Sequence, residues 1–128
     1  MIFLRDANTE AWREARDREF NLVPKEYQHI AIYGVADRNI ECWLAAHREY
    51  LAQQLNVTPE ELDIDDPSPI IKNRLGTDKF SRIVAIVKDA PLRNWIKNEE
   101  SFESFYDDAR DLSQRLPHLG CNIPNEKD

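Results

Sequence analysis

The chain has 128 residues with a formal net charge of −7, and 32% of its residues are charged against 41% hydrophobic. This length suits one domain and this composition suits a globular chain, so collagen-like, low-complexity and membrane-spanning proteins are excluded. The acidic excess argues against a polybasic nucleic-acid binder, because neutralising many phosphates requires an excess of Lys and Arg.

The cysteines and the N-terminus indicate the compartment. Cys42 and Cys121 belong to no CxxC motif or Cys/His cluster, so a structural zinc site is not expected. The first residues contain no basic segment followed by an apolar one, so we expect no secretory signal, a cytoplasmic location and no native disulfide. The three histidines, His29, His47 and His118, are scattered and are predicted to be structural or exposed.

The first 35 residues predict a strand, a helix and a second strand. Residues 1–5 form an apolar run of strand length, and a charged helix with a modest apolar stripe follows over 10–20. Asn8 or Thr9 is its expected N-cap. After a polar connection over residues 21–28, the second strand is predicted at 29–35. This spacing is typical of a βαβ crossover and therefore of a parallel sheet.

Helices dominate the remainder of the chain. An apolar face of helical period predicts one helix over 40–55, with Asp37 or Asn39 as N-cap. Thr58 begins a capping box with Pro59, and this short turn leads into an acidic loop at 62–66. Further helices are expected from a Ser68-Pro69 cap to Gly76, over 79–90 with Phe80, Ile83, Val84 and Val87 on one side, around Leu92, Trp95 and Ile96, and from a Ser101 cap to Leu116.

These elements predict an α/β fold in which a small parallel sheet carries a helical C-terminal half. We expect one domain over residues 1–116 and an irregular tail over 117–128. A two-stranded parallel sheet is seldom stable by itself, and an unpaired sheet edge is a liability. The sequence therefore predicts self-association or a protein partner.

Asp6 and Asn8 are the first candidate site residues. They follow the first strand in an Asp-x-Asn spacing, at the edge of the sheet where ligands bind in open α/β folds. Both side chains could face one hard cation, and their oxygen atoms suit Mg²⁺ or Mn²⁺. The alternative is an ordinary Asx turn and N-cap.

Asp37 and Glu41 are the second candidate pair, at the end of the second strand. Glu41 lies in the first turn of a helix between apolar neighbours, so its carboxylate is expected to be partly buried and to need an Arg, a helix N–H or a metal as partner. The alternative is that Glu41 only compensates the helix dipole, with Asp37 and Arg38 forming a weak surface pair.

Four segments together resemble the Toprim (topoisomerase-primase) proteins, and most closely a Toprim-like family of bacterial defence and mobile-element loci. They are RDAN at 5–8, ADRNIECWLAA at 36–46, KFSRIVAIVKDA at 79–90 and SFESFYDDARDL at 101–112. The resemblance covers most of residues 1–116. It implies a Mg²⁺-dependent site for phosphodiester chemistry, and thus a nuclease or its remnant acting in anti-phage defence.

The resemblance assigns Asp6 to the first Asp of the family's paired-aspartate motif and Glu41 to the Glu of its Glu-x-Trp motif, as catalytic residues and metal ligands. Asn8 replaces the second Asp, which removes one negative charge. The glutamate-bearing strand that precedes the Asp motif in Toprim domains is not found. The resemblance therefore leaves three alternatives: the chain is a shortened form of a Mg²⁺-dependent endonuclease, another chain supplies the first catalytic glutamate, or the protein is not catalytic.

The carboxylates at this edge, Asp6, Glu41 and Asp37, with Asn8 as a neutral ligand, suffice for one Mg²⁺ and are marginal for two. Arg5 and Arg38 are the candidate phosphate-binding residues if the partner is a nucleic acid, and Lys25, Lys72 and Arg74 are further cations.

Two other functions remain open. One is a non-catalytic interaction subunit that docks a partner chain, such as an ATPase, through its incomplete sheet or acidic surface. The weaker one is an inhibitor that mimics nucleic acid, which only the net charge suggests.

Overall fold

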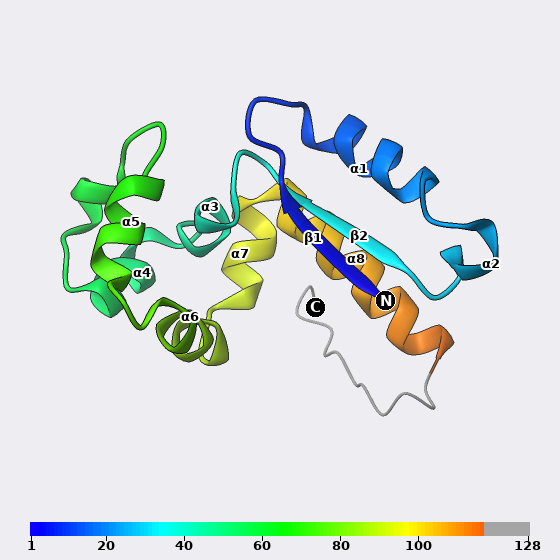
Figure 1. Ribbon diagram of the computed structural model, residues 1–128. Coiled ribbons are helices and arrows are strands. Elements are labelled where there is room, and N and C mark those ends of the chain that lie inside the picture. The colour runs from blue at the N-terminus through cyan, green and yellow to red at the C-terminus, as the bar shows by residue number, and fades with distance from the viewer. Residues whose placement is uncertain (117–128) are drawn as a thin grey trace.

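The computed structural model describes residues 1–116 as an α/β fold, with one two-stranded parallel sheet followed by a helical C-terminal half (Figure 1). The fold class predicted from the sequence is confirmed, while the expected tail at 117–128 lies outside the described residues. In chain order the elements are β1 (Ile2–Asp6), α1 (Trp12–Asn21), α2 (Lys25–Gln28), β2 (Ile32–Ala36), α3 (Ile40–Leu44), α4 (Arg48–Leu55), the 3₁₀ turn η1 (Pro59–Leu62), α5 (Ser68–Leu75), α6 (Lys79–Lys88), α7 (Leu92–Asn98) and α8 (Glu100–Arg115).

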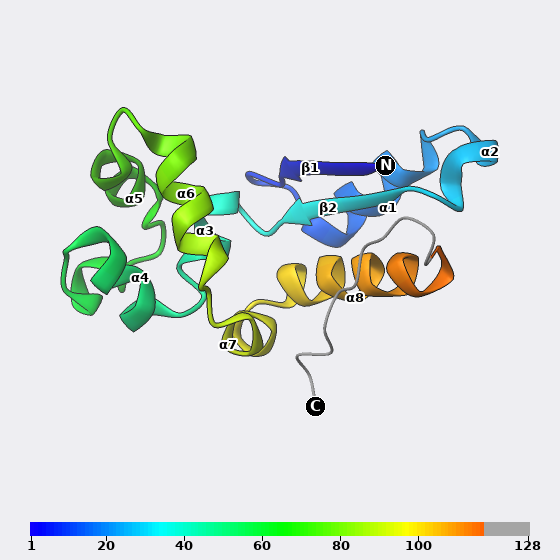
Figure 2. The same ribbon diagram turned by 90° about the horizontal axis from the view of Figure 1, so that it is seen from below.

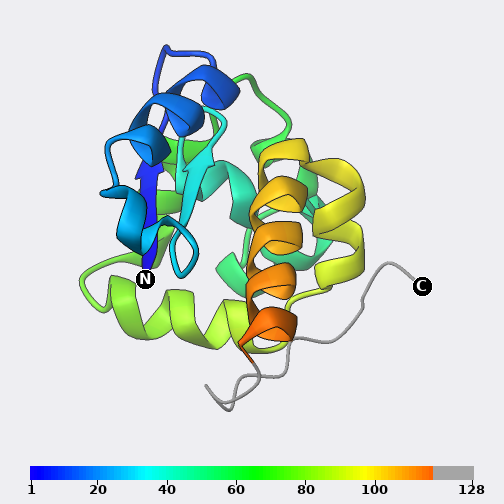
Figure 3. The same ribbon diagram turned by 90° about the vertical axis from the view of Figure 1, so that its right-hand side faces the viewer.

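The sheet pairs β1 with β2 in parallel, in a register that runs from Ile2 opposite Ile32 to Asp6 opposite Ala36. Helices α1 and α8 cover opposite faces of β2, so β2 is the buried strand. In Figures 2 and 3, β1 lies farther from α8 than β2 does. Strand β2 is therefore the buried strand of the sheet, and β1 is the more exposed one.

The second strand begins later than predicted. His29, Ile30 and Ala31 are not in β2, because Pro24 starts a helical turn, α2, where the sequence predicts a polar connection. The turn continues past α2 as the backbone N–H of Ile30 donates to the carbonyl of Tyr27 at 3.1 Å. The first strand is found within one residue of its predicted bounds.

Neither Asn8 nor Thr9 caps α1, which corrects that prediction. Ala11 occupies the N-cap position, and no side chain caps this helix. Asn8 instead has a left-handed backbone (φ 56°), and its N–H donates to the carbonyl of Arg38 at 2.7 Å. Asn8 thus joins the loops that follow the two strands.

The predicted helix over 40–55 is interrupted. It is divided into α3 and α4, because His47 forms a new N-cap and its Nδ1 accepts a hydrogen bond from the N–H of Tyr50 at 3.1 Å. His47 is therefore structural, as predicted. The apolar periodicity is continuous through the break, so the period alone does not reveal it.

The predicted caps differ in outcome. Asn39 caps α3, Thr58 forms the capping box of η1, and Gly76 ends α5 with a positive φ of 68°. Two predicted caps are wrong, because Ser68 is the first residue of α5 and Ser101 lies inside α8, behind the N-cap Glu99.

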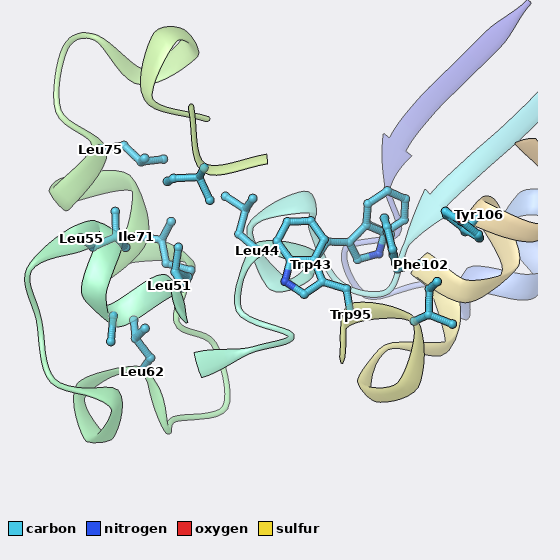
Figure 4. Close-up of a cluster of buried hydrophobic side chains, with 14 residues drawn as sticks. Trp43, Leu44, Leu51, Leu55, Leu62, Ile71, Leu75, Trp95, Phe102 and Tyr106 are labelled. Atoms are coloured by element: carbon cyan, nitrogen blue, oxygen red, sulfur yellow. The ribbon is translucent and has the colours of Figure 1, made fainter. Parts of the chain in front are cut away.

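The main core lies in the helical half and reaches the sheet through α3 and α8. Figure 4 shows leucine and isoleucine side chains of α4, η1 and α5 gathered at one end of this core, with Trp43, Trp95, Phe102 and Tyr106 at the other. The aromatic residues predicted to be core (Trp12, Trp43, Trp95, Phe102 and Phe105) are buried or partly buried. A smaller cluster of Ala7, Trp12, Ala15 and Val35 lies between α1 and the sheet.

The predicted apolar face of α6 is largely exposed. Phe80, Val84 and Val87 are 81%, 50% and 43% exposed, and Ile86 is the buried residue of this helix. No helix within residues 1–116 is long and apolar enough to cross a membrane.

Candidate functional site

The candidate site lies where the carboxyl ends of β1 and β2 meet the start of α3. We call this region the crest, and it contains Asp6, Asn8, Asp37, Arg38 and Glu41. Asp6 is the last residue of β1, and its Oδ1 accepts a hydrogen bond from the backbone N–H of Ile40 at 2.9 Å. Since Ile40 is the first residue of α3, this bond fixes the carboxylate of Asp6 at the start of the helix that carries Glu41.

Glu41 is a buried carboxylate, 8% exposed, as expected from its apolar neighbours. Its Oε1 lies 3.5 Å from Nζ of Lys79 and 3.9 Å from Nζ of Lys72, which come from α6 and α5. Within residues 1–116 no hydrogen bond to this carboxylate is formed. Two solvent-accessible ammonium groups at long distance therefore balance the charge of Glu41.

Two left-handed residues shape the loops of the crest. Asn8 and Arg38 have φ angles of 56° and 71°, a conformation that non-glycine residues adopt rarely and at an energetic cost. A shallow cavity of about 350 Å³ lies beside them, lined by Asn8, Thr9, Arg38, Asn39 and Asp66. Residues with strained backbone of this kind cluster at binding sites, so the crest is a candidate binding site.

The other predicted site residues are placed differently. Asp37 is exposed, and its backbone N–H donates to Oγ of Ser101 at 3.0 Å. Arg5 lies against α1, where its guanidinium pairs with Glu19 at 2.8 Å and Glu10 at 3.4 Å. The backbone of the crest therefore joins Asp6 to the first turn of α3 and Asn8 to Arg38, while the carboxylate of Glu41 faces Lys72 and Lys79. Arg5 is already engaged elsewhere.

The donor set of the crest limits what it could hold. Residues 1–116 contain no group of three or more His, Cys, Asp or Glu side chains arranged to hold a metal ion. Mg²⁺, however, is often bound by one or two carboxylates together with waters and substrate phosphates. Asp6 and Glu41 with the amide oxygen of Asn8 are chemically suited to such a single-cation site.

The chain was compared with protein-family models, curated proteins and solved structures. No significant match was found. The likeness to Toprim proteins consequently rests on the sequence motifs.

Ser101 is an organising residue of the crest that the sequence analysis missed. It is 1% exposed, and its Oγ accepts hydrogen bonds from the N–H of Asp37 at 3.0 Å and from Nε1 of Trp43 at 2.8 Å. The same hydroxyl donates to Oε1 of Glu99 at 2.8 Å. One buried hydroxyl thus connects the loop after β2, helix α3 and the start of α8. Ser101 is the second residue of α8, where the sequence pattern predicts a helix cap, so no sequence signal indicated this role.

Glu99, which accepts from this hydroxyl, and Cys42, which lines the same cavity as Glu99, are both kept towards their neutral forms. Burial raises the pKa of the Glu99 carboxyl, although its hydrogen bonds with Ser101 oppose the shift. Burial also raises the pKa of the Cys42 thiol. Cys42 is therefore not expected to be a reactive thiolate.

We predict that Glu99→Gln stabilises the protein more at pH 7 than at pH 4. Because the pKa of Glu99 is raised in the folded state, the unfolded chain ionises first as pH rises above the ordinary value of 4.5, and stability is lost over that interval. Glutamine removes this loss and keeps an oxygen that can accept from Ser101. Urea unfolding at both pH values measures the effect.

Glu100→Gln is the matched control, because that side chain is 73% exposed in a surface ion pair with Arg13. It should change stability little at either pH. An equal gain from Glu99→Gln at pH 4 and pH 7 would contradict the prediction.

Proposed function

We propose that the crest binds one divalent cation, Mg²⁺ or Mn²⁺, through Asp6 and Glu41, and that the chain is a Toprim-like metal-dependent nuclease or its remnant. The hydrogen bond from Ile40 to Asp6 supports this proposal, because it brings a carboxylate from β1 to the start of the helix that carries Glu41. The proposal includes the anti-phage role and cytoplasmic setting expected from the sequence.

The residues of this chain have separable roles in the proposal. Asp6 is held by Ile40 through one oxygen, which leaves its second oxygen for a cation, and Asn8, two residues further along the chain, would supply a neutral oxygen. A bound cation would act as a Lewis acid on a phosphodiester oxygen. Asp37, exposed beside these residues, is the remaining candidate ligand.

The cations around the crest suit a phosphate. Lys72 and Lys79 are about half exposed and only loosely paired with Glu41, so their ammonium groups can turn towards a phosphate on the surface. Arg38 is exposed at the cavity beside Asn8. These three residues therefore replace Arg5 as the better candidates for phosphate binding.

Plasmid nicking with and without Mg²⁺ or Mn²⁺ tests this function. We expect Asp6→Asn and Glu41→Gln each to lower cation-dependent nicking at least about 100-fold, the size typical of losing one group that stabilises charge in the transition state. Both substitutions preserve shape, and asparagine keeps an acceptor for Ile40. Electron paramagnetic resonance of Mn²⁺ provides a second measurement, since bound Mn²⁺ should disappear in both variants.

Glu26→Gln is the matched control, because Glu26 is an exposed carboxylate on α2, away from the crest. It should nick plasmid and bind Mn²⁺ like the unaltered chain. The nuclease would be rejected if the unaltered chain nicks plasmid with neither Mg²⁺ nor Mn²⁺, or if nicking persists in both crest variants.

A second candidate function is an interaction subunit that docks a partner chain, such as an ATPase, through the incomplete sheet. The exposed strand β1 favours it, because Ile2, Leu4 and Phe3 are 62%, 48% and 37% exposed. The residues of β2 are by contrast buried or half-buried.

One pair of variants separates the two functions. Asp6→Asn should remove cation binding and leave docking intact, whereas Leu4→Lys should place a charge on the docking strand and leave cation binding intact. If both variants lose both properties, the two functions are not separate.

A further inference from the structure

Strand β1 is an apolar edge without cover. Met1, Ile2, Phe3 and Leu4 are 50%, 62%, 37% and 48% exposed, and their side chains carry no charge. Within residues 1–116 the sheet has two strands, so β1 has a neighbour on one edge alone. Exposed edges of this kind pair readily with another strand, and natural proteins usually protect them with charges or proline.

The hydrogen-bonding direction along β1 shows which backbone groups are available. The carbonyl of Met1 accepts from the N–H of Ile32 at 2.9 Å, and the N–H of Ala7 donates to the carbonyl of Ala36 at 2.9 Å. Odd-numbered residues therefore direct their backbone groups towards β2. Because these groups alternate along a strand, Ile2 and Leu4 direct theirs outwards.

We propose that β1 pairs with β1 of a second copy of this chain, antiparallel about a twofold axis at Phe3. This inference rests on the docking function and names its partner. Ile2 of each copy is then opposite Leu4 of the other as a hydrogen-bonded pair, and the two Phe3 residues are opposite each other as a non-hydrogen-bonded pair. The four outward N–H groups and four outward carbonyls of Ile2 and Leu4 in the two copies provide the bonds. The product is a four-stranded sheet.

This register matches side chains better than its neighbours. Side-chain alternation allows shifts of two residues only. One such shift places Ile2 opposite Asp6, so that an apolar side chain faces a carboxylate and both copies repeat the mismatch. The opposite shift places Ile2 at the axis and gives Leu4 no partner among residues 1–6. With Phe3 at the axis, the opposed pairs of residues 2–4 are all apolar, and the outermost pair sets Met1 opposite Arg5, whose guanidinium is already paired with Glu10 and Glu19.

The layers of the fold leave room for the second copy. Helix α8 packs under β2, and β1 lies on the side away from it (Figures 2 and 3). In the four-stranded sheet the two β2 strands are three strand spacings apart, about 14 Å. The two α8 helices, each about 10 Å across, then leave a narrow groove between them. Ile2 and Leu4 of both copies lie on this face, since Leu4 shares it with Phe105 of α8, and they fill the groove.

The charge of the chain favours this segment over the rest of the surface. Two copies with a net charge of −7 each repel one another, so contact is least costly where side chains are uncharged. Another exposed apolar group, Phe80, Val84 and Val87, is a helix face that lacks free backbone groups to pair. That face provides a control for non-specific adhesion.

Sedimentation equilibrium of the full chain tests the pairing. We expect a particle of twice the chain mass of 15.0 kDa. Leu4→Pro should give the monomer with an unchanged fold by circular dichroism, because the N–H it removes points away from β2. Leu4→Lys should also give the monomer, and it serves if the proline variant does not fold.

Phe80→Lys is the matched control and should remain dimeric, because Phe80 is the most exposed of the large apolar residues on α6. A monomeric unaltered chain, or a dimer that survives both Leu4 variants, overturns the pairing. The result for plasmid nicking is independent, so failure of the pairing and failure of the nuclease are distinguishable.

Disulfide trapping tests the register in a background with Cys42 and Cys121 replaced by serine. Phe3→Cys should form a covalent dimer on oxidation, because facing residues of a non-hydrogen-bonded pair have Cα atoms about 4.5 Å apart, within disulfide range. Leu4→Cys should crosslink at least about tenfold less, since it faces Ile2. More crosslinking at Leu4 than at Phe3 would reject this register.

Discussion

Trp43→Ala is expected to lower the free energy of unfolding by about 4 kcal/mol, the usual range for truncating a buried tryptophan. The ring of Trp43 packs edge-on against that of Phe102, with centroids 5.3 Å apart, and stacks with that of Phe105, with centroids 5.5 Å apart. Trp43 therefore joins α3 to α8. It also donates to Oγ of Ser101 at 2.8 Å. The substitution therefore removes both the aromatic contacts and a buried hydrogen bond between α3 and α8. Urea unfolding followed by circular dichroism measures the loss.

Trp12→Ala is the matched control, because Trp12 is also buried but belongs to the smaller cluster between α1 and the sheet. The guanidinium groups of Arg13 and Arg16 lie over the ring of Trp12, on the surface of α1. We expect a smaller loss for Trp12→Ala than for Trp43→Ala. The reverse order would mean that the contact between α3 and α8 is not the main junction of the fold.

The sheet and most helices could be predicted because their signals are local. A strand, a charged helix and a second strand within the first 36 residues determine a parallel pair. Prolines mark the starts of η1, α5 and α7, and a capping box adds a second signal at η1. The interruption before α4 could not be predicted from period. The interruption depends on a hydrogen bond in which Nδ1 of His47 accepts from the backbone N–H of Tyr50. This side-chain cap competes with a continuous helix through the same residues.

Helix α6 shows what periodicity does not contain. Its stripe of Phe80, Val84 and Val87 predicts an amphipathic helix correctly, yet these side chains are exposed while Ile86 is buried. The period identifies an apolar face, whereas the element that covers it is decided by the packing of distant segments. An apolar stripe in sequence therefore predicts either a core or a surface patch.

The candidate site divides in the same way. The position of Asp6 at the crest follows from the topology of parallel strands, and the burial of Glu41 follows from its apolar neighbours. The lysines that face Glu41 come from α5 and α6, more than one helix away in sequence, so no local pattern pairs them with it. Arg5 was predicted to be free to bind phosphate because the sequence does not show its ion pairs. Its partners Glu10 and Glu19 come close only when the chain turns from β1 into α1.

Gly34→Val is expected to destabilise the protein by about 2 kcal/mol through overpacking. A Cβ at this position would lie 2.6 Å from Cδ2 of Leu4 and 2.6 Å from Cδ2 of Phe105. Glycine is therefore required in the middle of β2 because α8 and the side chain of β1 approach the backbone closely there. Gly34→Ala should cost less, since one methyl group demands a smaller shift. Urea unfolding of both variants measures the series.

Leu4→Ala should partly restore the stability of Gly34→Val, because it removes one of the two atoms that the new side chain meets. Leu4 is half exposed and loses little packing by itself, so the restoration should exceed its own small cost. A double-mutant cycle would then show a coupling of about 1 kcal/mol or more. Additive effects would mean that Phe105 alone limits the space at Gly34. In that case the side chain at position 4 would not affect how closely α8 packs against the sheet at Gly34.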